Sequence, residues 1–385
     1  MSLVLDLWRI IWSLCPGCPL RQVCKFWRDT NRKNPLFVSY ISTTSMLEWA
    51  IKNGYNRYYL DEGRAIIHAA KNGHLELLKY LHRNGYRWGW DADACMYAAW
   101  YGHLDVLMYL HENGCSWDED ACIRAAENGH LHVLKYLHNN GCEWGEDICD
   151  DAAEGGHLHV VKYLRKEGCK WTNRTYRQAA RSGNLRLVKY LHENNCDRDP
   201  HASFGAAGEG HLHILKYLRK KGFEFTTETC RFAAERGRLG VLKYLHEAGC
   251  PWNADACAKA AGGGHLEVLK YLHEHGCSWD ELSFREAITG GHLHVVEYLC
   301  VNGCPRMQTG CYWAASCGHV EILKYLHKNG FELHSGSYIN AARNGHLNAV
   351  KYLHENGCPI DTHVWKAAID GGNQWVLAYL RTVAN

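Results

Sequence analysis

The sequence predicts an all-α fold, an elongated solenoid of about twelve or thirteen helix–turn–helix repeats preceded by a small helical head. The dipeptide Tyr-Leu begins at positions 80 and 109 and then recurs at every 27th position up to 379. A glycine follows the same period from Gly73 to Gly345. A fixed period of this length is typical of a stacked array, so the 385 residues are expected to form one array and not several globular domains.

Residues 116–142 show the physical pattern of one repeat. Asp118 is a suitable N-cap, and Gly129 is expected to end the first helix in a left-handed conformation. A second helix is expected from about His130 to Gly141. Neither helix covers its own apolar face, so neighbouring repeats must stack. The residues expected to be buried are Ala121, Cys122, Ala125, Ala126, Leu131, Val133, Leu134 and Leu137.

The array is expected to cover residues 44–385. Its first unit, 44–59, is degenerate and matches only the end of a repeat. Its last unit, 359–385, is also degenerate, with Asn373 at the position of the motif histidine, and is expected to act as a cap. Residues 1–34 are expected to form a separate helical segment.

The repeats resemble ankyrin repeats. Residues 264–274 read Gly-His-Leu-Glu-Val-Leu-Lys-Tyr-Leu-His-Glu, which is similar to the second ankyrin helix, and pairs such as Ala125-Ala126 match the first helix. The period is 27 residues and not about 33, and the missing stretch corresponds to the projecting β-turn. The array is similar to the shortened ankyrin type abundant in large DNA viruses of amoebae. This resemblance implies protein binding and no enzymatic activity.

Residues 3–29 resemble an F-box. The residues that match the pattern are Leu3, Leu5, Asp6, Leu7, Ile11, Leu14, Leu20, Val23, Cys24 and Trp27. The resemblance implies docking onto a Skp-type adaptor and a cullin. It assigns the adaptor contacts to Leu5, Leu7, Ile11, Leu20, Val23 and Trp27. The alternative is an amphipathic cap over the open end of the stack, which every solenoid needs.

A binding face is expected on the first helices. The residue directly before each alanine pair takes eleven different identities in eleven repeats, whereas the alanine after it never changes. A position that varies so freely does not pack into the shared core. The residue three positions on shares its helix face and is almost as mixed. In ankyrin stacks this face lines the concave groove that binds proteins. The candidates are His68, Tyr97, Trp100, Arg124, Asp151, Gln178, Arg181, Phe232, Lys259, Glu286, Trp313 and Asn340.

Large aromatic residues favour a binding role for this face over neutral drift of solvated positions. Tyr97 and Trp100 lie one helical turn apart and form the best single patch.

Charge gives little support for a nucleic-acid or membrane partner. The formal net charge is +2, and no 18-residue apolar run is present. Nine of twelve repeats carry a lysine before Tyr-Leu, and this row is interpreted as a solvated face. Its alternative is a phosphate-binding ladder, whose affinity would fall steeply with salt. The N-terminus is a poor secretory signal, so a cytoplasmic location is expected, in the host cytoplasm if the source is viral.

Most of the 19 cysteines and 26 histidines recur at fixed repeat positions. Buried thiols act as small apolar residues, and the histidines are expected at helix starts and on the surface. Cys15 and Cys18 form the only Cys-x-x-Cys motif, and no second pair completes a zinc site nearby. No catalytic motif is found either, so the sequence predicts no metal, no cofactor and no enzyme.

Two functions remain open. The first is a substrate-recruiting subunit of a cullin-type ubiquitin ligase, with a protein target in the repeat groove. The second is a plain binding scaffold or decoy, in which the N-terminal segment only caps the stack.

Overall fold

The computed structural model describes residues 62–85, 90–358, 360 and 362–383. All regular secondary structure in these ranges is helical and comprises 24 helices, which confirms the all-α prediction. The chain divides into two compact units, with the boundary between Gly145 and Glu146. The expected F-box-like segment, 1–34, and the degenerate unit, 44–59, lie outside the described residues.

Each repeat contributes two short antiparallel helices joined by a tight turn. In the first unit the first helices are α4 (Glu62–Lys71), α6 (Ala92–Trp100) and α8 (Glu119–Glu127), and the second helices are α5 (Leu75–Arg83), α7 (Leu104–Glu112) and α9 (Leu131–Asn139).

The second unit continues the same alternation. Its first helices are α10 (Ile148–Glu154), α12 (Asn173–Arg181), α14 (Ala202–Glu209), α16 (Thr227–Glu235), α18 (Ala254–Gly262), α20 (Glu281–Thr289), α22 (Gly310–Ser316), α24 (Ser335–Arg343) and α26 (Thr362–Asp370). Its second helices are α11 (Leu158–Lys166), α13 (Leu185–Glu193), α15 (Leu212–Lys220), α17 (Leu239–Glu247), α19 (Leu266–Glu274), α21 (Leu293–Val301), α23 (Val320–Lys328), α25 (Leu347–Glu355) and α27 (Gln374–Val383).

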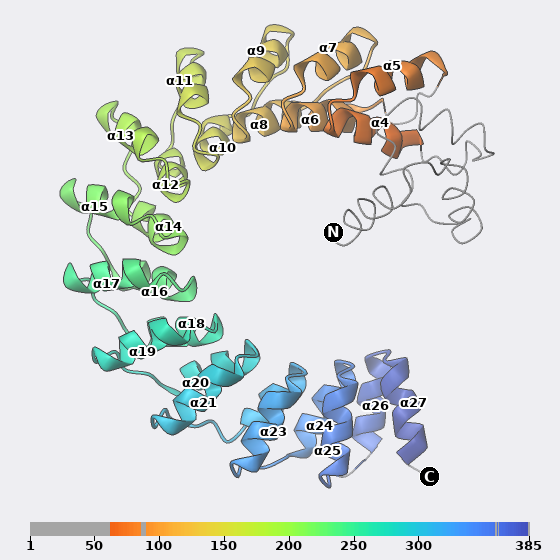
Figure 1. The fold of residues 1–385 in the computed structure, drawn as a ribbon, viewed down its shortest axis with the longest axis vertical. Coiled ribbons are helices and arrows are strands. Elements are labelled where there is room, and N and C mark those ends of the chain that lie inside the picture. The colour runs from red at the N-terminus through yellow and green to blue at the C-terminus, as the bar shows by residue number, and fades with distance from the viewer. Residues whose placement is uncertain (1–61, 86–89, 359, 361, 384–385) are drawn as a thin grey trace, which may run out of the picture. The chain divides into compact units, whose positions relative to one another are not determined.

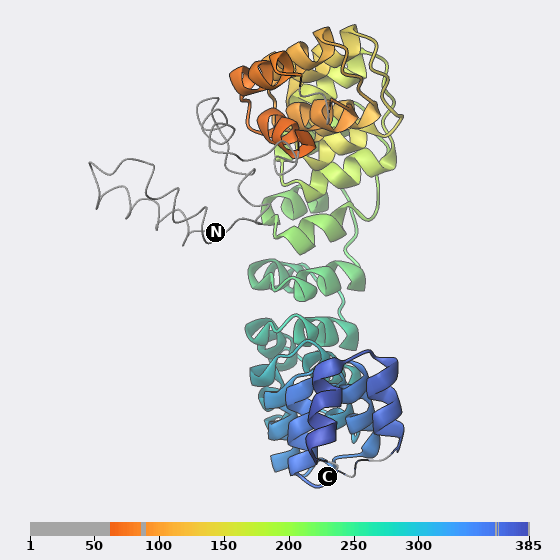
Figure 2. The same ribbon diagram turned by 90° about the vertical axis from the view of Figure 1, so that its right-hand side faces the viewer.

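Within each unit the first helices form one row and the second helices form another (Figure 1). Figure 2 shows the helix pairs of the second unit as successive layers. The two rows differ in the side chains that they bury. Most first helices bury an alanine pair, and three of them also bury an aromatic ring, Tyr176, Phe284 or Tyr338, whereas second helices bury a triad of aliphatic residues such as Val133, Leu134 and Leu137. Small residues allow first helices to pack closely, as the stacking of successive repeats requires.

The repeat of residues 116–142 forms as predicted, with two differences. Asp118 is the N-cap of α8, but its side chain accepts no hydrogen bond from the helix. Gly129 has a φ of +79°, and α9 begins directly after His130. Seven of the eight residues expected in the core are fully buried, whereas Leu131 at the start of α9 is only half-buried.

The motif histidines join successive repeats. They stand at the N-caps of second helices, and in several repeats the ring Nε2 hydrogen-bonds a carbonyl oxygen of the first helix in the preceding repeat. The distance is 3.0 Å from His130 to Trp100 and 2.9 Å from His292 to Gly262. In the last repeat Asn373 takes the place of the histidine, and its Nδ2 donates to the Arg343 carbonyl oxygen at 2.6 Å. These side chains satisfy carbonyl groups at the ends of first helices, which have no partner within the helix.

Several of the lysines that precede Tyr-Leu contact the next repeat. Lys162 lies 4.9 Å from the ring centre of Tyr190 in the next repeat, and Lys243 lies 5.5 Å from that of Tyr271. On the same side, the Tyr136 hydroxyl and His111 Nδ1 are 3.1 Å apart. Five of the nine lysines make cation–π contacts with the next repeat, namely Lys162, Lys189, Lys216, Lys243 and Lys351. Lys79, Lys270 and Lys324 instead pair with a glutamate three residues earlier in their own helix. None of the helices in the described part of the chain is long and apolar enough to span a membrane.

Candidate protein-binding face

The variable residues of the first helices lie together on one side of each helix, which we call the first-helix face. The face consists of the residue before each alanine pair and the residue three positions later. The alanine pairs are buried beneath it, so the backbone of the face is fixed while its side chains differ between repeats. Most of the predicted residues are half-buried, which places them at the surface with one side in contact with a neighbour. These are His68, Tyr97, Trp100, Arg124, Asp151, Phe232, Lys259, Glu286, Trp313 and Asn340.

Two predicted residues differ from this pattern. Arg181 is exposed, whereas Gln178 is only 7% exposed. The Gln178 amide is held inside the face because its Nε2 donates to Glu154 Oε2 of the preceding first helix at 2.7 Å. Gln178 therefore links α10 and α12 and presents little surface to a partner.

The first unit carries an aromatic patch on this face, formed by Tyr97, Trp100 and Tyr101. The rings of Tyr97 and Trp100 are parallel within 8°, with centres 6.2 Å apart. Tyr101 continues the row, 6.1 Å from Trp100, and is 41% exposed. Trp100 is stacked on both sides, which restricts its rotamers, and the three rings together form one apolar surface.

Cations border the aromatic patch on both sides. The Arg124 guanidinium lies 4.8 Å from the ring centre of Trp100, and the Lys71 ammonium lies 5.4 Å from that of Tyr101. Arg124 also pairs with Glu127 at 2.7 Å, which fixes its position over the tryptophan. A surface of stacked rings with positive edges suits a partner that presents apolar side chains next to carboxylates.

In the second unit a chain of ion pairs runs along the face. Arg181 lies between two carboxylates, 3.5 Å from Glu154 and 3.7 Å from Glu209. Arg238 extends the chain, 3.8 Å from Glu209. Gly205 lies beside Arg181, and a Cβ at this glycine would meet the arginine Cβ at 3.0 Å. The missing side chain leaves room for Arg181 to bridge three repeats.

A second aromatic pair follows this chain. Phe204 and Phe232 are stacked, with ring centres 5.7 Å apart. The Arg231 guanidinium lies 4.2 Å from the ring centre of Phe232 and pairs with Glu228 and Asp255. Here too an apolar surface is bordered by fixed charges.

Three residues that belong to the first-helix face or border it, Tyr101, Lys71 and Phe204, were not among the predicted binding residues. Tyr101 is the C-cap of α6, four residues after Tyr97, and Lys71 ends α4. Phe204 lies one position before Gly205, which is the residue directly before the alanine pair of its repeat. Tyr101 lies four positions after Tyr97, and Lys71 lies three positions after His68. Helical spacing would therefore have found both residues. Phe204 could not be predicted in this way, because its place in the face depends on stacking against Phe232 of the next repeat.

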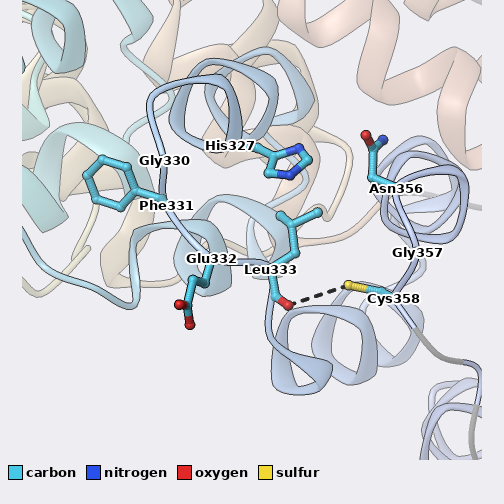
Figure 3. Close-up of a pocket in the computed structure, with 8 residues that line it drawn as sticks. All are labelled: His327, Gly330, Phe331, Glu332, Leu333, Asn356, Gly357 and Cys358. Atoms are coloured by element: carbon cyan, nitrogen blue, oxygen red, sulfur yellow. Dashed lines mark hydrogen bonds between the residues drawn. The ribbon is translucent and has the colours of Figure 1, made fainter.

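A surface depression lies between α23 and the loop after α25, lined by His327, Gly330, Phe331, Glu332, Leu333, Asn356, Gly357 and Cys358 (Figure 3). The Cys358 thiol points to the Leu333 carbonyl oxygen at 3.7 Å, so it contacts the backbone of the loop. The other potential reactive group, His327, has its Nδ1 2.9 Å from the Tyr352 hydroxyl, so the hydrogen bonds of the histidine and the cysteine go to other groups and not to each other. We therefore assign it no chemistry.

A comparison with protein families agrees with this architecture. A family model described as "Ankyrin repeats (3 copies)" matches residues 37–120, 95–175, 230–337 and 284–364, which together span more than half of the chain. The crystal structure of the human ASB11 ankyrin repeat domain is 23% identical, with a TM-score of 0.37, and the match covers 43% of this chain and 86% of that one. A search of curated proteins gave no match.

Proposed function

Because the chain belongs to the ankyrin-repeat family, a family of protein-interaction scaffolds, we propose that its first-helix face binds a target protein and that residues 1–34 bring this protein to a cullin-type ubiquitin ligase. The observation that carries the first part is the aromatic patch of Tyr97, Trp100 and Tyr101. Stacked aromatic side chains at the surface are the residue types that dominate binding energy in protein interfaces.

The surroundings of the patch indicate how it would bind. Rings that are already ordered lose little conformational entropy in a complex, so more of the energy of apolar burial is retained as affinity. Arg124 and Lys71 would add orientation, because they attract carboxylates at the edges of the apolar contact. The target is therefore expected to present an apolar segment flanked by acidic residues.

The second unit would offer a further contact. Arg181 and Arg238 are already paired with carboxylates, so a partner must either fit between fixed charges or exchange these pairs for its own. This makes the second unit a source of specificity, whereas the aromatic patch of the first unit supplies most of the affinity.

The ligase part of the proposal is based on the F-box-like pattern of residues 3–29. In this proposal Leu5, Leu7, Ile11, Leu20, Val23 and Trp27 contact a Skp-type adaptor, and the target on the repeats receives ubiquitin. The protein acts in the cytoplasm, in a host cytoplasm if it comes from a large DNA virus of amoebae. The second candidate is a scaffold or decoy in which the segment 1–34 caps the stack.

Purified components separate these candidates. A Skp-type adaptor is titrated into the full chain, into a chain lacking residues 1–34, and into the variant Leu7→Asp. The ligase proposal predicts saturable binding by the full chain alone. Binding that is absent from the full chain, or equal in all three proteins, contradicts it.

The binding face is tested separately in a eukaryotic cytosolic extract. Proteins captured by the wild-type chain are compared with those captured by Trp100→Ala and by Trp375→Ala. Trp375 is a matched control, because it is 80% exposed and lies on α27, outside the aromatic patch. A target that is lost with Trp100→Ala and retained with Trp375→Ala supports the proposed face. Equal capture by both variants contradicts it.

A further inference from the structure

Five repeats each bury two cysteines in direct contact. Cys115 and Cys122, which are close in sequence, belong to different pairs. One cysteine of a pair lies in the first helix and the other in the loop after the second helix. The Sγ atoms are 3.0 Å apart in two of the pairs, Cys122–Cys142 and Cys230–Cys250. The other three hydrogen-bonded pairs are Cys95–Cys115, Cys149–Cys169 and Cys257–Cys277.

The thiols of each pair are arranged with a direction. The Cys122 thiol donates to Cys142 Sγ, and the Cys142 thiol donates to the carbonyl oxygen of Asp118 at 3.3 Å. The hydrogen bond from Cys122 lowers the pKa of Cys142, although burial acts against it. The loop cysteine is therefore the more acidic member, and the thiolate is the reactive form of cysteine.

Other repeats supply an internal contrast. Cys196 and Cys304 occupy the same loop position, but Tyr176 and Phe284 stand where the helix cysteine would be. Burial raises the pKa of both lone thiols to about 12. The loop position alone does not activate a thiol, whereas the second cysteine does.

Packing alone does not require two cysteines at these positions. In repeats that carry an aromatic ring and one cysteine at these two positions, both side chains are buried as well, so the core can be filled without a second thiol. A metal site does not explain the pairs either. Within the described ranges, no group of three or more histidine, cysteine or acidic side chains is placed to hold a metal ion, and structural zinc takes four ligands.

We propose that the five cysteine pairs are modification sites, each of which forms a disulfide within its repeat when it meets a low-molecular-weight disulfide such as glutathione disulfide. The loop thiolate attacks one sulfur of the oxidant and forms a mixed disulfide, releasing one glutathione thiol. The helix thiol then loses its proton and attacks the loop sulfur, which releases the second glutathione. Two protein thiols are oxidised, and one glutathione disulfide is reduced to two thiols.

The fold fits this order of events. The loop cysteines follow the glycine that ends each second helix, and around Gly114, Gly141 and Gly249 there is open space. Local opening of this loop exposes the loop thiol, while the helix cysteine remains in the core. Once formed, the bond ties the loop to the first helix and restricts the opened state of that repeat.

The test uses the full chain equilibrated in glutathione buffers of increasing disulfide fraction. The reaction is stopped with acid, free thiols are alkylated, and peptides are mapped by mass spectrometry. The expected result is a peptide pair linked through Cys122 and Cys142, with both cysteines lost from the alkylated pool. Cys196 stays alkylatable and serves as the lone-thiol reference.

Two variants make the result specific. Cys142→Ser is expected to abolish the link in its own repeat and to leave the Cys230–Cys250 link intact, whereas Cys196→Ser leaves all five links. The proposal is overturned if Cys122 and Cys142 remain reduced in buffers that oxidise a short dithiol peptide. It is also overturned if Cys196 is oxidised as readily as Cys142, or if the links form only in urea.

Discussion

Replacing Gly102 by alanine isolates the contact that joins two repeats. Gly102 has a φ of +78°, in the left-handed region, and a Cβ there would lie 2.6 Å from His130 Nδ1. His130 cannot move away freely, because its Nε2 is bonded to the Trp100 carbonyl oxygen at 3.0 Å. The substitution therefore adds backbone strain and also breaks a hydrogen bond between repeats.

The expected loss of stability is the sum of the backbone strain and the lost hydrogen bond. A left-handed conformation costs a residue with a Cβ about 1 kcal/mol or slightly more. Loss of the His130 hydrogen bond adds about 1 kcal/mol. Gly114→Ala is the matched control, because Gly114 has a φ of +85° and nothing within 4 Å of its Cβ position. We expect a destabilisation of about 2–3 kcal/mol for Gly102→Ala and about 1 kcal/mol for Gly114→Ala.

Hydrogen exchange followed by mass spectrometry is the suitable assay, because long repeat arrays do not always unfold in one step. Peptides that cover α6 to α9 report the local free energy of opening in both variants. Gly102→Ala is expected to speed exchange in α6 and α8 more than Gly114→Ala does. Equal effects of the two substitutions would refute the reasoning, because they would leave only the backbone term.

Three further predictions concern the same stack. Burial lowers the pKa of His130, so the folded state binds fewer protons and stability is lost as pH falls through the ordinary histidine value of 6.5. Asn373 makes the equivalent bond in the last repeat, so the variant His130→Asn is expected to fold. Between pH 8 and pH 5 its free energy of unfolding, measured by urea titration, should fall less than that of the wild type. The same pH dependence in both proteins would contradict this. Gln178→Ala should destabilise α12 by about 1 kcal/mol, because it removes the bond to Glu154, and unchanged exchange there would contradict it. Trp100→Ala should lower the free energy of unfolding by about 1 kcal/mol and lower the affinity for the target, measured by titration, more than tenfold. Equal losses of folding and binding free energy would contradict this.

The repeat itself is well determined by sequence because its signals are local. Helix caps, terminal glycines and the spacing of apolar residues all lie within one repeat, and α8 and α9 begin and end close to the predicted residues. Neighbouring repeats add only copies of the same contacts. Leu131 differs because it stands at the first position of α9, where the chain leaves the turn and one side stays open.

Contacts between positions far apart in sequence were not predicted. Cys122 pairs with Cys142 at the far end of its repeat, and Lys162 lies over Tyr190 of the next repeat. The residues found at one repeat position do not reveal which other position lies against it in the fold. For the same reason the burial of Gln178, which depends on Glu154 in the preceding repeat, was not evident.

The central claim is that the aromatic patch holds the target protein, and site-specific photo-crosslinking tests it most directly. A photoreactive phenylalanine is introduced at Tyr101 or at Met108, which are similarly exposed, at 41% and 36%. Tyr101 is the C-cap of a first helix, α6, whereas Met108 lies on a second helix, α7. Both proteins are irradiated in the presence of a target captured by wild-type protein. The proposal predicts a crosslink from position 101 and none from position 108. A crosslink from position 108 alone, or equal crosslinking from both positions, would contradict it.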